Sequence, residues 1–140
     1  MVEFSNDDIK CISIFESITG ATALDCILAE NAVVFIVAQG DLGRAIGKKG
    51  ANITRVRQAF MRQVLVFEDN PDIEQFVRSL LAPIPITHIN IHEKSDSKTV
   101  YVTVEDKDRG TAIGKGGERV KLHRQMLQRK FNCDLKLISR

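Results

Sequence analysis

The sequence lacks several features that mark common classes of protein. Its 140 residues include no tryptophan and a single tyrosine, which argues against recognition dominated by stacking on aromatic rings. Its cysteines, Cys11, Cys26 and Cys133, are odd in number and far apart, and they form no Cys-x-x-Cys or Cys/His spacing. This pattern argues against a disulfide framework or a zinc site, so we expect three small core residues.

Long apolar runs are also missing. No apolar run approaches the ~18 residues that a membrane span needs, and the N-terminus has no basic segment followed by an apolar one. We therefore expect a cytoplasmic protein. The composition, 44% apolar and 27% charged, is that of a globular chain long enough for one domain or two small ones.

A short segment occurs twice, and this repeat organises the chain. Residues 45–50 have the sequence AIGKKG, and residues 112–117 have the sequence AIGKGG. A shift of roughly 67 residues aligns the first segment and its neighbours with the second, without a gap from Asp41 to Gln58. We therefore predict two copies of one structural unit.

The net charge of +2 conceals a separation of charge along the chain. Residues 1–41 contain seven acidic residues and one basic residue, Lys10. Basic residues gather around the two segments. The arginines among them are weaker candidates for phosphate contact than the lysines of the segments, and they are Arg44, Arg55, Arg57, Arg119 and Arg124. This distribution predicts a polyanionic partner that touches both copies.

Residue patterns in the first copy predict the order helix, strand, strand, helix, turn, helix, strand. The first helix is predicted to begin at Ser5, whose side chain suits an N-cap, and to end before Gly20. Apolar runs bounded by turn residues predict strands at 23–29, 32–38 and 64–67. Further helices are predicted at 41–46 and from Gly50 onwards.

The second copy repeats this order. Asn70 is the predicted N-cap of its first helix and Pro71 the first helical residue, and alternating valines predict a half-buried strand at 100–104. We predict an α+β fold with two domains, at residues 1–69 and 70–140, joined by a connection too short to be a flexible tether.

The glycine segment has the properties of an anion-binding loop. Between two helices, Gly-x-x-Gly lets the backbone approach a ligand closely and adopt positive φ angles. The following helix directs its N-terminal amides at an anion held there, and Lys48, Lys49 and Lys115 add full charges. The apolar residues that could line an adjacent groove for bases are Ile46, Ile53, Ile113 and Val120.

Two other phosphate-binding motifs do not fit. A Walker A loop needs four residues between its first glycine and Gly-Lys, but three separate Gly43 from Gly47 and three separate Gly110 from Gly114. A Rossmann Gly-x-Gly-x-x-Gly does not occur. Plain helix caps would account for the glycines, but not for the isoleucine before and the lysine inside both segments.

Each copy resembles a KH domain of the type II topology, α-β-β-α-α-β, in its Gly-x-x-Gly motif and its order of elements. The tandem pair, with FESITGA at residues 15–21 and LAP at residues 81–83, is similar to the archaeal NusA-like transcription factors. The resemblance covers essentially the whole chain. It implies a three-stranded sheet packed on helices in each domain, RNA binding, RNA polymerase as a partner, and a role in transcription elongation, pausing or termination.

These observations together predict a non-catalytic protein that clamps single-stranded RNA, with no cofactor, membrane or small-molecule substrate. The candidate RNA-binding residues are Ile46, Gly47, Lys48, Lys49, Gly50, Ile53, Arg55, Arg57, Ile113, Gly114, Lys115, Gly116, Gly117, Val120 and Arg124. His88 and His92 have a helical metal spacing, but in a strand they lie apart on one face, so we expect no metal site.

Three other functions are alternatives. KH folds also serve in ribosome biogenesis, and a scaffold could bind polymerase by protein contacts alone. A nucleotide hydrolase could use the glycine loops, although neither loop has an acid beside it for Mg²⁺.

Two differences between the copies, Lys49 against Gly116 and Val56 against His123, lead us to expect unequal RNA sites.

Overall fold

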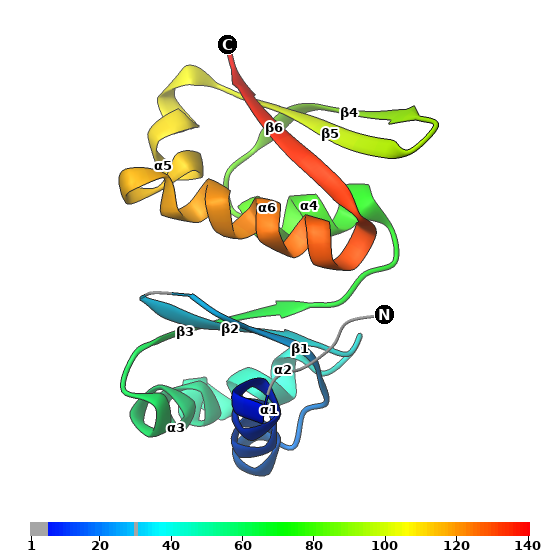
Figure 1. The fold of residues 1–140 in the computed structure, drawn as a ribbon. Helices are drawn as coiled ribbons and strands as arrows, with labels where there is room; N and C mark the ends of the chain where they lie inside the picture. Colours follow the sequence, from blue (N-terminus) through cyan, green and yellow to red (C-terminus); the bar gives the residue numbers. More distant parts are fainter. Residues whose placement is uncertain (1–5, 30) are drawn as a thin grey trace. The chain divides into compact units, whose positions relative to one another are not determined.

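A computed structural model describes residues 6–29 and 31–140 of the chain. The chain divides into two compact units, Met1–Pro71 and Asp72–Arg140, and each has the element order α-β-β-α-α-β (Figure 1). Each unit is a three-stranded sheet packed on helices, which confirms the predicted α+β class. The predicted cap Ser5 lies outside the described residues.

The first unit carries its glycine loop in the crossover between two parallel strands. Its elements are α1 (Asn6–Thr19), β1 (Ala23–Leu28), β2 (Ala32–Val37), α2 (Leu42–Ile46), a 3-10 turn (Lys48–Gly50), α3 (Ala51–Phe60) and β3 (Gln63–Glu68). Strand β2 pairs antiparallel with β1 and parallel with β3. Because parallel neighbours need a crossover, the chain passes from β2 through α2, the glycine loop and α3 before it returns as β3.

The core of the first unit lies between the sheet and its helices, which cover one side of the sheet (Figure 1). Alternate residues of β2, namely Val33, Phe35 and Val37, are buried there, as β periodicity requires. Phe15 of α1 stacks on Phe35 with ring centroids 4.1 Å apart, Phe60 of α3 lies 5.7 Å from Phe35, and Val56 of α3 belongs to the same core cluster. This packing fixes α3, and with it the end of the glycine loop.

The second unit repeats the same topology. Its elements are α4 (Ile73–Leu81), β4 (Ile86–Lys94), β5 (Ser97–Val104), a 3-10 turn (Asp106–Asp108), α5 (Arg109–Ile113), a second 3-10 turn (Lys115–Gly117), α6 (Glu118–Phe131) and β6 (Cys133–Ser139). Strand β5 pairs antiparallel with β4 and parallel with β6. A register shift between Ile86 and His88 explains the imperfect alternation of β4 in the sequence.

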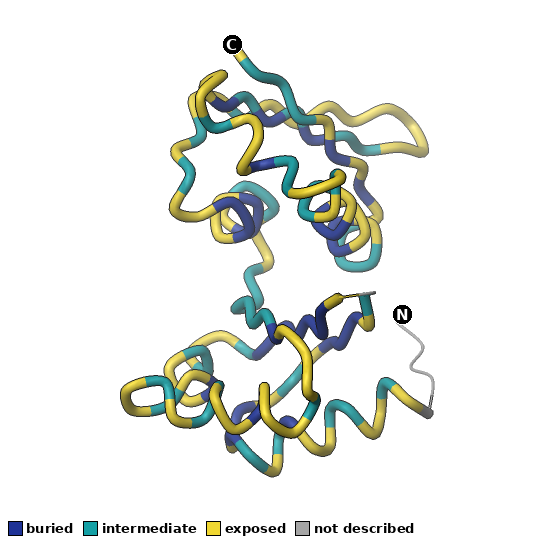
Figure 2. Tube along the Cα trace, turned by 90° about the vertical axis from the view of Figure 1, so that its left-hand side faces the viewer, coloured by how far each residue is buried: buried dark blue, intermediate teal, exposed yellow. Residues whose placement is uncertain are grey.

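The second core also uses alternate residues of its central strand. Val100, Val102 and Val104 are fully buried, and Met126 of α6 and Phe76 of α4 pack in the same unit. In Figure 2 the buried positions of these helices and strands form the dark blue interior of the unit. The register of the central strand therefore decides which residues of this sheet face the helices and which face outwards.

The start of α4 differs from the prediction. The helix begins at Ile73 with Asp72 as its N-cap, so Asn70 and Pro71 lie before it rather than in its first turn. The amide of Asp69 still donates to the carbonyl of Val37, at 2.7 Å, so the chain remains tied to the first sheet until just before this point. Within residues 6–29 and 31–140, no helix is both long and apolar enough to cross a membrane.

The cysteines are thiols that belong to the packing of the two units. Cys26 and Cys133 are buried, as predicted, whereas Cys11 is half-buried. Burial raises the pKa of each thiol, and the pKa of Cys26 rises to about 12. Because the thiolate is the reactive form, a raised pKa disfavours reactivity, and the buried Cys26 and Cys133 act as small core side chains.

Candidate nucleic-acid interface

The two glycine loops have nearly the same backbone. The first glycine has φ 78° and ψ 171° at Gly47, and φ 79° and ψ 170° at Gly114. The last glycine is left-handed in both, with φ 76° at Gly50 and 80° at Gly117. The amide of the last glycine donates to the carbonyl of the first at 3.1 Å in each loop. The sequence repeat is therefore a repeat of local geometry.

The first glycine of each loop is required by contact as well as by conformation. A Cβ atom at Gly47 would lie 2.8 Å from the backbone nitrogen of Asn52, and one at Gly114 would lie 2.8 Å from that of Arg119. Both distances are below any normal carbon contact. The missing side chain therefore lets the first turn of the next helix pack directly against the loop.

The loops present donors and charge at the start of a long helix. The amides of Lys48 and Lys49 open a 3-10 turn, so they have no acceptor within that turn. The ten-residue helix α3 follows at once and adds the partial positive charge of its N-terminus. Lys48, Lys49 and Lys115 are exposed. An anion at either loop would meet amides, a helix dipole and ammonium groups together.

The apolar residues beside the loops differ in exposure. Ile46 is 40% exposed, whereas Ile113 is half-buried. Ile53 is half-buried and packs against the first core, and Val120 is half-buried at the aligned position of α6. Ile53 thus belongs partly to the core, whereas Ile46 offers the most apolar surface beside a loop.

The candidate arginines of the first unit divide between two faces of α3. Arg57 is four residues from Ile53 and therefore lies beside it on the helix surface. Arg55 is two residues from Ile53 and lies on a different face. Both arginines are exposed. The structure therefore brings Arg57 together with the apolar border of the loop, but not Arg55.

The aligned arginine of the second unit has a structural contact. Arg124 is four residues from Val120 on α6, and its Nε donates to the carbonyl of Leu135 at 3.0 Å. This hydrogen bond ties α6 to β6. Arg124 is exposed, and its spacing from Val120 places it beside that residue on the helix surface.

Sequence reasoning did not identify the residues that hold each loop against its neighbouring helix. Asn52 donates from Nδ2 to the carbonyl of Arg44 at 2.8 Å, and Arg119, at the aligned position, donates from Nη1 to the carbonyl of Thr111 at 3.3 Å. The two acceptors are also aligned. The only signal in the sequence is that both donors stand five residues after the first glycine of the loop.

Arg119 makes further contacts that its counterpart does not. Its Nη2 donates to the carbonyls of Leu80 at 3.2 Å and Ala82 at 3.4 Å, at the C-terminal end of α4. Burial lowers the pKa of this guanidinium. Arg119 was a weaker candidate for phosphate contact, and these three carbonyl contacts make it a residue that joins α4, α5 and α6.

In the first unit the corresponding contact to the preceding helix comes from α2. Arg44 donates to the carbonyl of Gly20 at 3.4 Å, at the end of α1, and its guanidinium lies 3.9 Å from the carboxylate of Asp41. The residue aligned with Arg44 is Thr111, which cannot reach so far. The arginine that contacts the preceding helix therefore lies on α2 in the first unit and on α6 in the second.

The aspartate before the first crossover helix also distinguishes the units. Asp41 accepts a hydrogen bond at Oδ2 from the amide of Thr22, at 2.8 Å. In the second unit the strand registers align Thr22 with Pro85, which has no amide proton. Among the described residues, the aligned oxygen, Oδ2 of Asp108, is buried without a hydrogen-bond partner.

His123 occupies the core position of Val56. The residue is 2% exposed, and burial together with the charge of Arg119 lowers the pKa of its imidazole to about 4. The side chain is therefore neutral at pH 7 and lies inside the unit.

In residues 6–29 and 31–140 no group of His, Cys, Asp and Glu side chains could hold a metal ion.

Comparison with known proteins identifies the family. A model described as "KH domain" matches residues 11–78, and a model described as "NusA-like second KH domain" matches residues 73–136. A protein of Halococcus morrhuae named "Probable transcription termination protein NusA" is 34% identical over 133 residues, which cover 95% of each chain. The chain belongs to the archaeal NusA-like family of proteins with two KH domains.

Two further proteins match over a similar length. A protein of Halobacterium salinarum with the same name is 32% identical over 133 residues, again 95% of each chain. A solved structure titled "Crystal structure of APE1850" is 37% identical and has a TM-score of 0.83 over 98% of this chain and 100% of that one. The NusA-like resemblance seen in the sequence is thus confirmed, and each glycine loop lies inside a matched KH domain.

Proposed function

We propose that the chain is an RNA-binding transcription factor that clamps single-stranded RNA with its two glycine loops. One observation carries the proposal: the loops repeat the same backbone geometry, with lysines beside amides at the start of a long helix. A KH loop of this kind holds about four nucleotides. Each loop contacts backbone phosphates, and the apolar residues beside it contact bases.

The clamp of the first unit consists of Ile46 to Gly50 with Ile53 and Arg57, and that of the second consists of Ile113 to Gly117 with Val120 and Arg124. Arg55 contributes only long-range charge, because it lies on another face of α3. Two clamps in one chain that engage one RNA strand raise the effective concentration of the second contact, so the pair binds more tightly than either alone.

The proposed context of this binding is transcription. Relatives across the whole chain are named as transcription termination proteins, and the family combines two KH domains. We place the chain beside RNA polymerase in the cytoplasm, where it acts on the emerging transcript during elongation or termination. Its role is to bind, and it performs no chemical step on the RNA.

The test compares loop variants that reverse charge. Lys48→Asp with Lys49→Asp in one variant, and Lys115→Asp in another, should each weaken binding to a single-stranded RNA of about 12 nucleotides, longer than the roughly eight that two clamps hold. If three to five phosphates are neutralised, log Kd should vary with log salt with a slope near 2 to 3.5 in magnitude, and both variants should flatten it.

Lys10→Asp is the control for Lys115→Asp, because Lys10 is an exposed lysine of α1 and its substitution changes the net charge equally. It should leave the affinity and the slope nearly unchanged. Full affinity in both loop variants would show that the RNA lies elsewhere. Crosslinking in cells, followed by sequencing of the bound RNA, would separate nascent transcripts from ribosomal RNA and so test the transcriptional role.

A further inference from the structure

The outer face of the second sheet carries an unusual set of side chains. The inward residues of β5 are the valines of the core, so Thr99, Tyr101 and Thr103 face the other way. The helices of this unit cover the inner side of the sheet (Figure 1). Strand pairing places Asn90 and Lys136 on either side of Tyr101.

Tyr101 is the centre of this face. Its ring packs edge to face with the imidazole of His92, with centroids 4.9 Å apart, and the Nζ atom of Lys136 lies 6.0 Å from the ring centroid. The tyrosine is half-buried and both neighbours are exposed. We call Tyr101, His92, Lys136 and the flanking Asn90, Thr99 and Thr103 the Tyr101 face.

The two sheets differ sharply at this position. The repeat aligns Val34 with Tyr101 and Ile36 with Thr103, and both first-unit residues are buried. The outward positions of the first sheet are therefore apolar, whereas those of the second are polar around a single ring. A hydrophobic sheet face suits a packing partner, but a polar face with one aromatic ring suits a ligand with a flat ring and polar edges.

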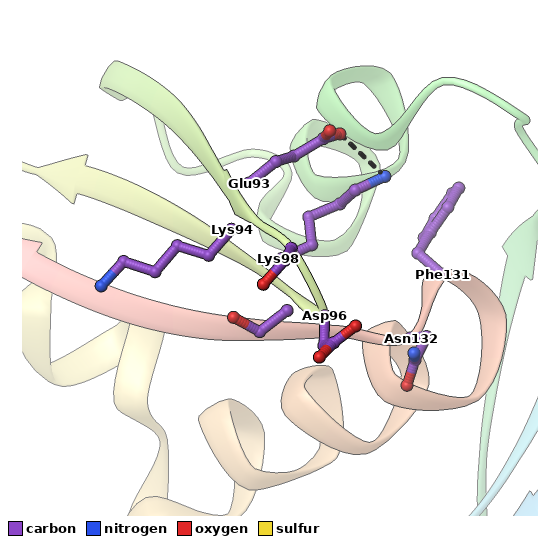
Figure 3. Close-up of a pocket in the computed structure, with 8 residues that line it drawn as sticks. Glu93, Lys94, Asp96, Lys98, Phe131 and Asn132 are labelled. Atoms are coloured by element: carbon purple, nitrogen blue, oxygen red, sulfur yellow. Dashed lines mark ion pairs between the residues drawn. The ribbon is translucent and has the colours of Figure 1, made fainter.

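Charge favours an anionic ligand at the same face, because two lysines, Lys136 and Lys94, outnumber Asp134, the acid that lies opposite Thr99 at an outward position of β6. Lys136 lies beside the ring, and Lys94 is the next outward residue after His92 on β4. Figure 3 shows Lys94 pointing away from the ion pair of Glu93 and Lys98, whose oxygen and nitrogen are 3.2 Å apart. A base stacked on the ring would thus have ammonium groups within reach of its phosphates.

We propose that the Tyr101 face binds one base of single-stranded RNA, with Tyr101 as the stacking surface and Lys136 as a phosphate contact. The inference rests on the proposed RNA-binding function and extends the RNA path beyond the glycine loops. Asn90, Thr99 and Thr103 offer donors and acceptors to the edge of the base. A protein partner fits less well, because Ile138 is the one aliphatic side chain at an outward position of β5 and β6.

The composition of the chain provides a site-specific probe. Tyr101 is the only tyrosine, so incorporation of 3-fluorotyrosine gives one ¹⁹F resonance from the middle of the face. Titration with single-stranded RNA of about 12 nucleotides should shift this resonance, because a stacked base adds a ring current. An abasic oligomer of equal length and charge should bind through phosphates and leave the resonance nearly unmoved.

Affinity measurements give an independent readout. Tyr101→Val, which installs the residue of the first sheet, should weaken RNA binding by about fivefold or more, as expected for the loss of one stacked base. Tyr101→Phe keeps the ring and should retain most of the affinity. Lys136→Gln should flatten the salt dependence by about 0.7 in slope. Equal melting temperatures would show that the variants remain folded.

The outcomes separate this inference from the function on which it rests. If RNA binds and the loop variants weaken it, but the ¹⁹F resonance stays still and Tyr101→Val binds normally, the Tyr101 face is not an RNA site while the clamp stands. If the abasic oligomer shifts the resonance as much as RNA does, base stacking is wrong. If wild-type protein binds no RNA, both proposals fall.

Discussion

Lys49 and Gly116 occupy the same place in the two glycine loops and adopt nearly the same left-handed conformation, with φ and ψ of 55° and 29° in Lys49 and of 63° and 18° in Gly116. The loops therefore differ in charge and not in backbone path. A residue with a Cβ in this region carries about 1 kcal/mol of strain, which Gly116 avoids. The first loop accepts that strain and gains an ammonium group.

Gly116→Lys should make the second loop resemble the first. A Cβ at Gly116 meets open space, so the variant should fold at a cost of about 1 kcal/mol for the positive φ. Its added charge should raise the affinity for single-stranded RNA by up to about fivefold at low salt. Fluorescence anisotropy over a range of salt concentrations would measure both the affinity and the steeper slope.

Gly116→Gln is the matched control, because it brings the same backbone strain without the charge. It should lose the same stability as Gly116→Lys and gain no affinity. Lys49→Gly should act in the opposite direction, with weaker RNA binding and no loss of stability. An equal gain in the lysine and glutamine variants would show that charge at this position is irrelevant.

Gly47→Ala and Gly114→Ala should destabilise their units by about 2 to 4 kcal/mol, because the new methyl group would overlap the next helix and φ is positive at both sites. Gly43→Ala is the control, since it lies inside α2 where a Cβ meets open space, and it should be neutral or slightly stabilising. Urea unfolding followed by circular dichroism would measure the difference. Alanine at the first glycine is therefore a test of folding, and the lysine variants are the cleaner test of binding.

The two aligned aspartates should respond differently to alanine. Asp41→Ala removes the acceptor of the Thr22 amide and should cost about 1 kcal/mol. Asp108→Ala removes a buried oxygen that lacks a partner, so it should cost clearly less or even stabilise the second unit. Denaturant unfolding of both variants gives the comparison. Equal losses would mean that Pro85 does not change the surroundings of Asp108.

The buried imidazole should make the second unit sensitive to acid. The folded pKa of His123 is about 4 and its ordinary value is 6.5, so protonation favours the unfolded chain. The contribution of the neutral imidazole to the free energy of unfolding is fully present above about pH 6.5. It decreases towards about pH 4, by up to about 3 kcal/mol. His123→Val should lose less stability than wild type over that range.

Unfolding of the second unit can be followed through the fluorescence of Tyr101, which is the only tyrosine and lies in that unit. Carboxylates contribute to acid sensitivity in both proteins, so the difference between them isolates the histidine. Parallel stability curves for wild type and His123→Val between about pH 7 and 4.5 would contradict the assignment.

The repeat explains why so much of the fold could be predicted. A Gly-x-x-Gly that recurs with the same neighbours fixes the order of the surrounding elements, and apolar periodicity then places the helices and strands. The predicted start of α4 was wrong. Asn70 and Pro71 are both favourable at a helix start, but the hydrogen bond between Asp69 and Val37 is a tertiary contact that holds the chain outside the helix up to this point. Local preference cannot anticipate where such a contact ends.

The details of the candidate site could be predicted less well, because long side chains find their partners only in the folded chain. Arg119 and Arg124 are both weaker candidates for phosphate contact in the sequence, and only the structure shows that Arg119 also donates to three backbone carbonyls and Arg124 to one. His123 lies on an apolar helix face in the sequence, which predicts a packed or half-exposed residue, and the structure packs it in the core. The assignment of the lysines and glycines to RNA remains a prediction, as does the domain boundary at residues 69 and 70.

The unequal lengths of α3 and α6 show where this architecture tolerates insertion. Helix α6 has 14 residues where α3 has 10, and the alignment of the two units stays ungapped from Asp41 through Gln58, so the extra residues lie near the C-terminal end of the helix. Four residues are close to one helical turn, which returns the chain to the same face. A designer could therefore lengthen either crossover there, to carry a label or a tether, while the loop keeps its shape.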